Sequence, residues 1–167
     1  DILNTSRIES GLIKVQKAPM SLTLLIEEQM QMIKGFAEEK NIEVTGQKPI
    51  VFDQVYVDKD MMSQVIVNLL SNAVKYTQMG GHVSITAREE EGNILVEVRD
   101  NGVGIASEDI PHLFDDFYVG KTKPEGERRS GVGLAITKRI IEAHDGSIYV
   151  DSELGKGTTV TLSLPVK

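Results

Sequence analysis

The segment from Gln64 to Tyr76 has the spacing of apolar and polar residues that predicts an amphipathic helix. At about 100° per residue, its polar positions fall within roughly one quadrant, which holds Gln64, Asn68, Asn72 and Lys75. The opposite side carries Met62, Val65, Ile66, Leu69, Leu70 and Ala73. Asparagine is a mediocre helix former, so two at positions i and i+4 require a reason. A magnesium-bound polyphosphate is one reason, because amide oxygens are hard ligands and lysine is a cation. A solvated helix face is the other.

The pattern on either side of this helix predicts two more helices and a set of strands. Ser21 is the expected N-cap of a helix over about 22–40. The residues expected on or near the buried side of that helix are Leu24, Leu25, Met32, Ile33 and Phe36. Asp58 is the expected cap of the helix that ends near Tyr76, and a third helix covers about 131–144. Strand-like segments occupy residues 41–45, 50–57, 82–88, 94–99, 147–151 and 158–164.

The order of these elements predicts an α+β domain built as a two-layer α/β sandwich. One mixed, mainly antiparallel sheet carries the helices on one face. Short turns or breaks are expected at 18–19, 47–49, 80–81, 89–93 and 154–157. Residues 107–130 are polar and lack sustained periodicity, which predicts a lid or a locally mobile segment.

Residues 1–18 differ from the rest of the chain. Their apolar residues have helical spacing and need a partner helix: Ile2, Leu3, Ile8 and Leu12. The segment looks like the tail of a helical bundle whose beginning lies upstream. We therefore expect a domain boundary near residue 18 and one domain over 19–167.

Composition limits the classes of function. The chain has 167 residues, enough for one domain with a core, and 40% of them are hydrophobic. No apolar run approaches the roughly 18 residues of a membrane span, and no signal peptide opens the chain. The absence of cysteine excludes disulfides and thiolate metal sites and fits a reducing compartment. A net charge of −7 without a basic stripe argues against nucleic-acid binding.

Three glycine-bearing motifs follow the asparagine-rich helix. In the first, Asp100 ends a strand and is followed by Gly102 and Gly104. A buried carboxylate there can accept a hydrogen bond from an exocyclic amine, and the glycines let the backbone approach a flat base. A plain turn explains the same string.

The second motif lies at the start of the third predicted helix. The third motif lies in the last predicted hairpin. Gly131, Gly133 and Leu134 mark a helix start, where free N–H groups and the helix dipole favour anions; a tight junction is the alternative. The third motif comprises residues 155–158 and ends in Thr158. Taken alone, it is a hairpin turn.

The order of these motifs resembles the N, G1, F, G2 and G3 boxes of the bacterial sensor histidine kinases, with Phe114 and Phe117 matching the F box. Over roughly 20–167 the chain is similar to their catalytic ATP-binding domain, within the gyrase–Hsp90–histidine kinase–MutL superfamily. Residues 1–11 resemble the end of the dimerisation helices that precede it. The resemblance implies the Bergerat-type ATP-binding fold.

The resemblance also implies ATP and Mg²⁺ as cofactors and a role for each matching residue. Asn72 would be the magnesium ligand, while Asn68 and Lys75 would act beside the phosphates as catalytic residues. Asp100 would bind the adenine amino group. Further nucleotide contacts are implied for Tyr76, Gly102, Gly104, Ile105, Phe117, Gly131, Val132, Gly133, Leu134 and Thr158.

The lid departs from the family pattern at two positions. Arg129 stands where the second glycine box often has a further glycine, and Val119 stands where an arginine is common after the F-box aromatics. A cation for the γ-phosphate would then come from Lys121, Lys123, Arg128 or Arg129, and the sequence does not decide among them.

The function implied by the resemblance is transfer of the γ-phosphoryl group of ATP to a histidine. His82, His112 and His144 lack the acid–arginine–proline context of the family's phosphoacceptor box, so we expect structural or surface roles for them. The acceptor should lie upstream, on a dimerisation domain, and the fragment alone should bind Mg-ATP without phosphorylating itself. The hydrolysing relatives and the serine kinases have a glutamate where this chain has Asn68. Since an amide cannot accept a proton, ATP hydrolysis or serine phosphorylation is disfavoured.

The runner-up function is a non-catalytic ATP-sensing interaction module. For the kinase, the expected partners are the dimerisation domain and, downstream, the receiver domain of a response regulator. The fragment is expected to be monomeric and cytoplasmic, and its parent homodimeric. Membrane anchoring of the parent follows from family habit alone.

Overall fold

A computed structural model describes residues 14–46, 54–115 and 133–165. Its helices are α2 (Leu22–Glu39), α3 (Lys59–Lys75), the short 3₁₀ helix η1 (Ile110–His112) and α4 (Gly133–Ala143). Its strands are β1 (Ala18–Ser21), β2 (Glu43–Gly46), β3 (Gln54–Val57), β4 (His82–Glu90), β5 (Asn93–Asp100), β6 (Ser147–Glu153) and β7 (Gly157–Pro165). Within these residues, no helix is both long enough and apolar enough to cross a membrane.

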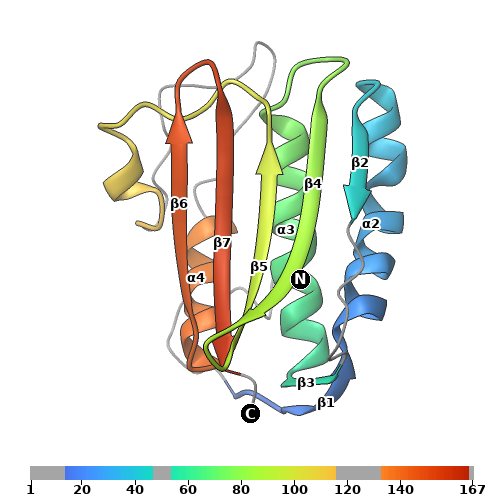
Figure 1. Ribbon diagram of the computed structural model, residues 1–167, viewed down its shortest axis with the longest axis vertical. Coiled ribbons are helices and arrows are strands. Elements are labelled where there is room, and N and C mark those ends of the chain that lie inside the picture. Colours follow the sequence, from blue (N-terminus) through green and yellow to red (C-terminus); the bar gives the residue numbers. More distant parts are fainter. Residues whose placement is uncertain (1–13, 47–53, 116–132, 166–167) are drawn as a thin grey trace.

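Five strands form one sheet, and the three α-helices lie against one of its faces (Figure 1). The strand order is β2-β4-β5-β7-β6, in which β2 runs parallel to β4 and the other pairs are antiparallel. This arrangement confirms the predicted two-layer sandwich. The register places Thr158 of β7 opposite both Asp100 of β5 and Ser152 of β6. The strand ends that carry the predicted motifs therefore meet at one end of the sheet.

The two predicted N-caps are present. The side-chain oxygen of Ser21 accepts a hydrogen bond from the Leu24 N–H at 3.1 Å, and Asp58 Oδ1 accepts one from the Met61 N–H at 3.1 Å. Each satisfies a donor that the first helical turn leaves without an intrahelical partner. The apolar side of α3 is buried as predicted, with Val65 and Leu70 fully covered.

The predicted buried face of α2 is partly wrong. Leu24 and Met32 are 57% and 73% exposed. Phe36 agrees with the prediction, because it is half-buried and packs against the core. The buried residues of α2 form one stripe along the helix: Leu22, Leu25, Ile26, Gln29, Ile33 and Ala37. One of these residues, Gln29, is polar. A prediction that counts only apolar residues does not include it, and therefore misplaces the buried face of α2.

The predicted break at residues 18–19 is instead part of a strand. β1 pairs antiparallel with β3 in a separate two-stranded sheet, with Pro19 opposite Tyr56. Proline lacks a backbone N–H, so it reads as a strand breaker, but an edge strand tolerates it. Of the predicted strand over 50–57, the structure describes only β3, and the turn expected at 47–49 lies outside the described residues. The expected helix near the N-terminus, with Ile2, Leu3, Ile8 and Leu12, also lies outside them.

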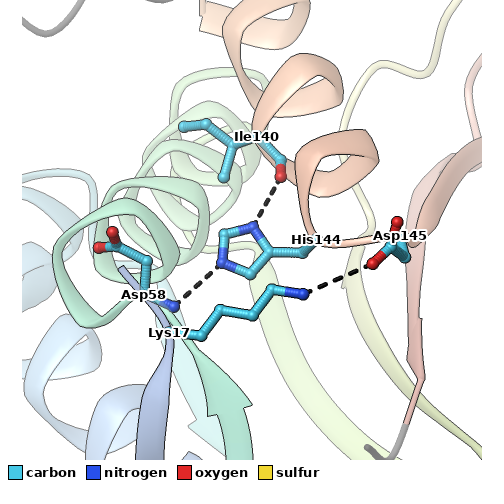
Figure 2. Close-up of polar contacts among 5 residues, drawn as sticks. All are labelled: Lys17, Asp58, Ile140, His144 and Asp145. Carbon is cyan, nitrogen blue, oxygen red and sulfur yellow. Dashed lines mark hydrogen bonds and ion pairs between the residues drawn. The ribbon is translucent and has the colours of Figure 1, made fainter. Parts of the chain in front are cut away.

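His144 joins the end of α4 to the start of α3 (Figure 2). The ring is 2% exposed, and its Nε2 accepts the backbone N–H of Asp58 at 3.0 Å. Its Nδ1 therefore carries the proton and donates it to the Ile140 carbonyl at 2.8 Å. The neutral imidazole thus makes two hydrogen bonds, which gives His144 the structural role expected of it.

The segment before β1 is attached to the same junction. The Gln16 N–H donates to Asp58 Oδ2 at 2.9 Å, and the Lys17 ammonium lies 3.5 Å from the Asp145 carboxylate (Figure 2). The other two histidines lie nearer the surface. His82 is half-buried beside Thr45, and the exposed His112 pairs with Asp115 at 3.0 Å.

We expect the contribution of His144 to the stability of the domain to fall as pH drops below about 6.5. Burial lowers the pKa of His144 below its ordinary value of 6.5, with the adjacent Lys17 ammonium acting in the same direction. The unfolded chain then binds the proton more readily, so the contribution of His144 to the free energy of unfolding is fully present above pH 6.5 and decreases below it. Urea denaturation at about pH 7.5 and about pH 5.5 measures this difference.

His144→Gln is the informative variant, because glutamine keeps a donor and an acceptor but does not titrate. It should lose less stability than the wild type between the two pH values. His112→Gln removes an exposed histidine and should behave as the wild type does. An equal loss in His144→Gln and the wild type would contradict this role for His144.

Candidate functional site

A pocket opens at the end of the sheet where the predicted motifs meet. It lies between α3, the end of β5 and the loop after it, α4, and the strands β6 and β7. Its walls are formed by Leu69, Asn72, Ala73, Tyr76, Val98, Asp100, Gly104, Ile105, Leu113, Leu134, Val150, Thr158 and Val160. Apolar walls with a few convergent polar groups are typical of small-molecule sites.

The pocket brings together seven of the residues predicted from sequence: Asn72, Tyr76, Asp100, Gly104, Ile105, Leu134 and Thr158. Asn68, Lys75 and Gly102 lie on the same elements but do not line it, and Gly133 is the first residue of α4. The predictions for Phe117, Lys121, Lys123, Arg129, Gly131 and Val132 fall outside the described residues.

Sequence reasoning missed six apolar wall residues: Leu69, Ala73, Val98, Leu113, Val150 and Val160. Leu69 and Ala73 were assigned to the buried side of the helix, and both are indeed almost fully buried. An apolar pocket wall and a protein core have the same pattern of residues. The sequence therefore carried no signal that would separate them.

Asp100 is the buried charge of this pocket. It ends β5, is 9% exposed, and its Oδ1 accepts hydrogen bonds from the Gly102 N–H at 2.9 Å and the Thr158 N–H at 3.3 Å. Burial raises its pKa from 3.8 to about 6, although the two N–H groups act in the opposite direction. Both backbone donors reach Oδ1, which leaves Oδ2 for a ligand that offers a hydrogen-bond donor.

The glycines after Asp100 are required by packing of the chain. A Cβ on Gly102 would collide with the carbonyl oxygen of Tyr76, which also accepts the Val103 N–H at 3.0 Å. Gly104 has φ +74°, and a Cβ there would collide with the carbonyl of Glu153. The loop therefore packs closely between the end of α3 and the β6–β7 turn. This packing is a structural reason for the glycines, in addition to the expected approach of the backbone to a base.

Lys40 fixes the end of α3 and was not predicted from the sequence. Its ammonium donates to the carbonyls of Val74 and Lys75, each at 3.0 Å. These carbonyls lie at the negative end of the helix dipole, where a cation is favourable. The sequence placed Lys40 only at the end of the helix expected over about 22–40.

The polar face of α3 supplies the groups suited to a metal and to phosphates. Asn72 lines the pocket, and Asn68 and Lys75 lie one turn before and nearly one turn after it, all half-buried. Across the described residues, no group of three or more histidine, cysteine, aspartate or glutamate side chains gathers to hold a metal. Asn72 offers an amide oxygen to the pocket, and an amide oxygen together with phosphate oxygens suits Mg²⁺.

The first part of the predicted lid packs against the domain. Residues 107–115 form turns and the helix η1, and Leu113 is buried in the pocket wall. The Lys138 ammonium of α4 lies 5.6 Å from the centre of the Phe114 ring, within the range of a cation–π contact. The rest of the predicted lid lies outside the described residues.

Comparison with known families agrees with this geometry. The family described as histidine kinase-, DNA gyrase B- and HSP90-like ATPases matches residues 57–167. The chain is 41% identical over 146 residues to the sensor histidine kinase WalK of Bacillus subtilis, covering 86% of this chain and 23% of that protein. It is 36% identical to the sensor protein SrrB of Staphylococcus aureus, covering 99% of this chain and 28% of that one. The chain thus spans about a quarter of the length of these relatives.

Solved structures share the fold. The catalytic domain of histidine kinase ThkA superposes with a TM-score of 0.79 at 26% identity, covering 90% of this chain and 96% of that one. Full-length ShkA in complex with AMPPNP gives a TM-score of 0.83 at 28% identity, covering 98% of this chain and 34% of that one.

Asp100→Asn should stabilise the protein above pH 6. The carboxyl has a pKa of 3.8 when exposed and about 6 when folded, so the folded state loses stability as pH rises between these values. Asparagine keeps the acceptor at Oδ1 without the buried charge. We expect it to raise the free energy of unfolding by about 1–3 kcal/mol near pH 8, and by much less near pH 4.

Urea denaturation at these two pH values measures the effect. Asp151→Asn, at an exposed position of β6, is the matched control and should change stability little. If Asp100→Asn lowered the free energy of unfolding at the higher pH, burial of the Asp100 charge would not be the cost to stability described above.

Proposed function

The chain belongs to the family of histidine kinase-, DNA gyrase B- and HSP90-like ATPases, and on this basis we propose that it binds Mg-ATP and donates the γ-phosphoryl group to a histidine. The acceptor histidine lies on a dimerisation domain, and the phosphoryl group passes from there to the receiver domain of a response regulator. The observation that carries the proposal is the apolar pocket with one buried carboxylate at one end and the asparagine-bearing helix beside it.

The adenine ring fits the apolar end of the pocket. Asp100 Oδ2 accepts a hydrogen bond from the exocyclic amine, which offsets part of the cost of the buried charge. Ile105, Leu134 and Val160 supply apolar surface for the ring, and Tyr76 lies next to the nucleoside. Thr158 is the second polar group at this end of the pocket.

The phosphates fit the side of the pocket formed by α3 and the start of α4. Asn72 holds Mg²⁺ through its amide oxygen, with Asn68 beside it, and Lys75 contacts a phosphate as a point charge. The N-terminal end of α4, which begins at Gly133, favours anions through its dipole. Bound magnesium supplies charge neutralisation for the phosphates. Lys121, Lys123, Arg129, Gly131 and Val132 remain predicted contacts, as does Phe117 for anchoring the lid.

Phosphoryl transfer asks the protein for position and charge, with little covalent chemistry of its own. The bond between the γ-phosphorus and the bridging oxygen breaks, and a bond from the imidazole nitrogen to phosphorus forms. A neutral imidazole is already a nucleophile, so no strong base is needed. Asn68 cannot accept a proton, which disfavours activation of water or of a serine hydroxyl at that position.

The central experiment supplies the phosphoacceptor as a separate protein. The dimerisation domain of the same parent protein is mixed with this chain and labelled ATP in the presence of Mg²⁺. We expect label in an acid-labile, alkali-stable linkage on the dimerisation domain, and none on this chain alone. Measurable ATP binding without transfer would favour the non-catalytic sensing module, while rapid phosphate release by this chain alone would favour an ATPase.

Asn72→Ala identifies the metal ligand in the same assay. The variant should lose transfer, and its affinity for ATP should no longer depend on Mg²⁺, because the amide oxygen that links metal to protein is gone. Gln64→Ala, two turns earlier on the same polar face, is the matched control and should keep both properties. Unchanged magnesium dependence in Asn72→Ala would refute this role.

A further inference from the structure

The hydroxyl of Ser152 connects three segments around the adenine end of the pocket. Ser152 lies in β6 and is half-buried, but it does not line the pocket itself. Its Oγ lies 2.8 Å from the Ile105 N–H, 2.9 Å from the Gly157 carbonyl and 2.8 Å from the hydroxyl of Thr158. These groups belong to the loop after β5 and to the start of β7.

Only one assignment of protons satisfies all three contacts. A hydroxyl has one donor and two acceptor sites. The Ile105 N–H can only donate, so it occupies one acceptor site of Ser152, and the Gly157 carbonyl can only accept, so it takes the single proton. The remaining acceptor site must therefore receive the proton of Thr158. The Thr158 hydroxyl donates away from the pocket, toward Ser152.

We propose that Ser152 is a positioning residue that sets the direction of the Thr158 hydroxyl, so that Thr158 presents a hydrogen-bond acceptor, and not a donor, beside Asp100 at the adenine end of the pocket. Thr158 and Asp100 are opposite each other in the β5–β7 ladder, and both line the pocket. With its proton held by Ser152, the Thr158 oxygen presents a lone pair beside the Asp100 carboxylate.

This arrangement determines which purines the pocket accepts. An amine at position 6 of the purine offers donors to the two acceptors, as adenine does. A carbonyl at the same position is itself an acceptor. It therefore leaves the Asp100 carboxylate and the Thr158 oxygen without a donor. The inference rests on the proposed function and extends it, because it assigns part of the selectivity to a residue that the nucleotide does not touch.

Ser152 can also hold the loops together, and a purely structural role makes a different prediction. Loss of packing between loops would weaken all purine nucleotides by the same factor. Loss of proton direction would instead let the Thr158 hydroxyl rotate and donate to a carbonyl, which changes the ratio between nucleotides. The ratio of affinities for ATP and inosine triphosphate separates the two roles.

The test measures the dissociation constants of ATP and inosine triphosphate for the whole chain, with melting temperatures as a check of folding. In the wild type, ATP should bind more tightly. Ser152→Ala should reduce the ratio by about 3- to 10-fold, the value of one hydrogen bond. Ser152→Thr keeps the hydroxyl in a strand position that suits threonine, and it should restore the ratio.

Thr158→Val tests the same inference without disturbing Ser152. It removes the acceptor, so it should weaken ATP more than inosine triphosphate, and adding Ser152→Ala to it should not change the ratio further. A larger loss for inosine triphosphate in Thr158→Val would show that the hydroxyl donates to the ligand, and it would overturn the proposal. An unchanged ratio in a folded Ser152→Ala protein would overturn it as well.

These outcomes are distinct from a failure of the proposed function. If the wild-type chain bound neither nucleotide, the ATP site itself would be wrong, and the inference about Ser152 would fall with it. If the wild type preferred ATP and Ser152→Ala left that preference intact, the ATP site would stand and only the role of Ser152 would be refuted.

Discussion

The site depends on one buried carboxylate at the end of a central strand. Asp100 is held through Oδ1 by the N–H groups of Gly102 and Thr158, which come from the loop after β5 and from the neighbouring strand β7. Those two bonds hold the loop against the sheet and leave the second oxygen for a ligand. They do not remove the cost of burial, because the pKa of Asp100 stays raised at about 6. A ligand with hydrogen-bond donors lowers that cost. The cost of the buried charge in the free protein therefore favours binding of such a ligand.

The surroundings of Asp100 hold the neighbouring segments at fixed positions. Lys40 caps the last carbonyls of α3, and the carbonyl of Tyr76 accepts the Val103 N–H from the loop after Asp100. On the other side, Ser152 joins that loop to the start of β7. The helix that carries Asn72 and the carboxylate of Asp100 are thus connected through backbone groups. Functional groups are held in place by such supporting contacts.

The sequence predicted the layers of the fold and the elements that carry the site because each left a local signal. The alternation of β4 and β5, the apolar stripe of α3 and the two caps are properties of neighbouring residues. Asp100 and its glycines were recognisable because their order along the chain matches a known series of motifs. The buried face of α2 was misjudged because the polar Gln29 lies within it. β1 was missed because Pro19 is unusual in a strand.

The remaining features depend on contacts between distant segments, which one sequence does not display. Lys40 is 34 residues from Val74, and Ser152 is 47 residues from Ile105. His144 looked like a residue at a helix end, and only the fold places its ring on the N–H of Asp58. Neither the apolar pocket wall nor these supporting hydrogen bonds have a sequence pattern that differs from an ordinary core or turn.

A nuclear magnetic resonance titration of the Asp100 carboxyl, with and without Mg-ATP, tests the central claim most directly. We expect a pKa of about 6 for Asp100 in the free protein, because burial disfavours the charge. We expect a lower pKa in the complex, because the adenine amine donates to the ionised carboxylate. A pKa that ATP leaves unchanged, in a protein that does bind ATP, would contradict the assignment of Asp100 as the group that recognises adenine.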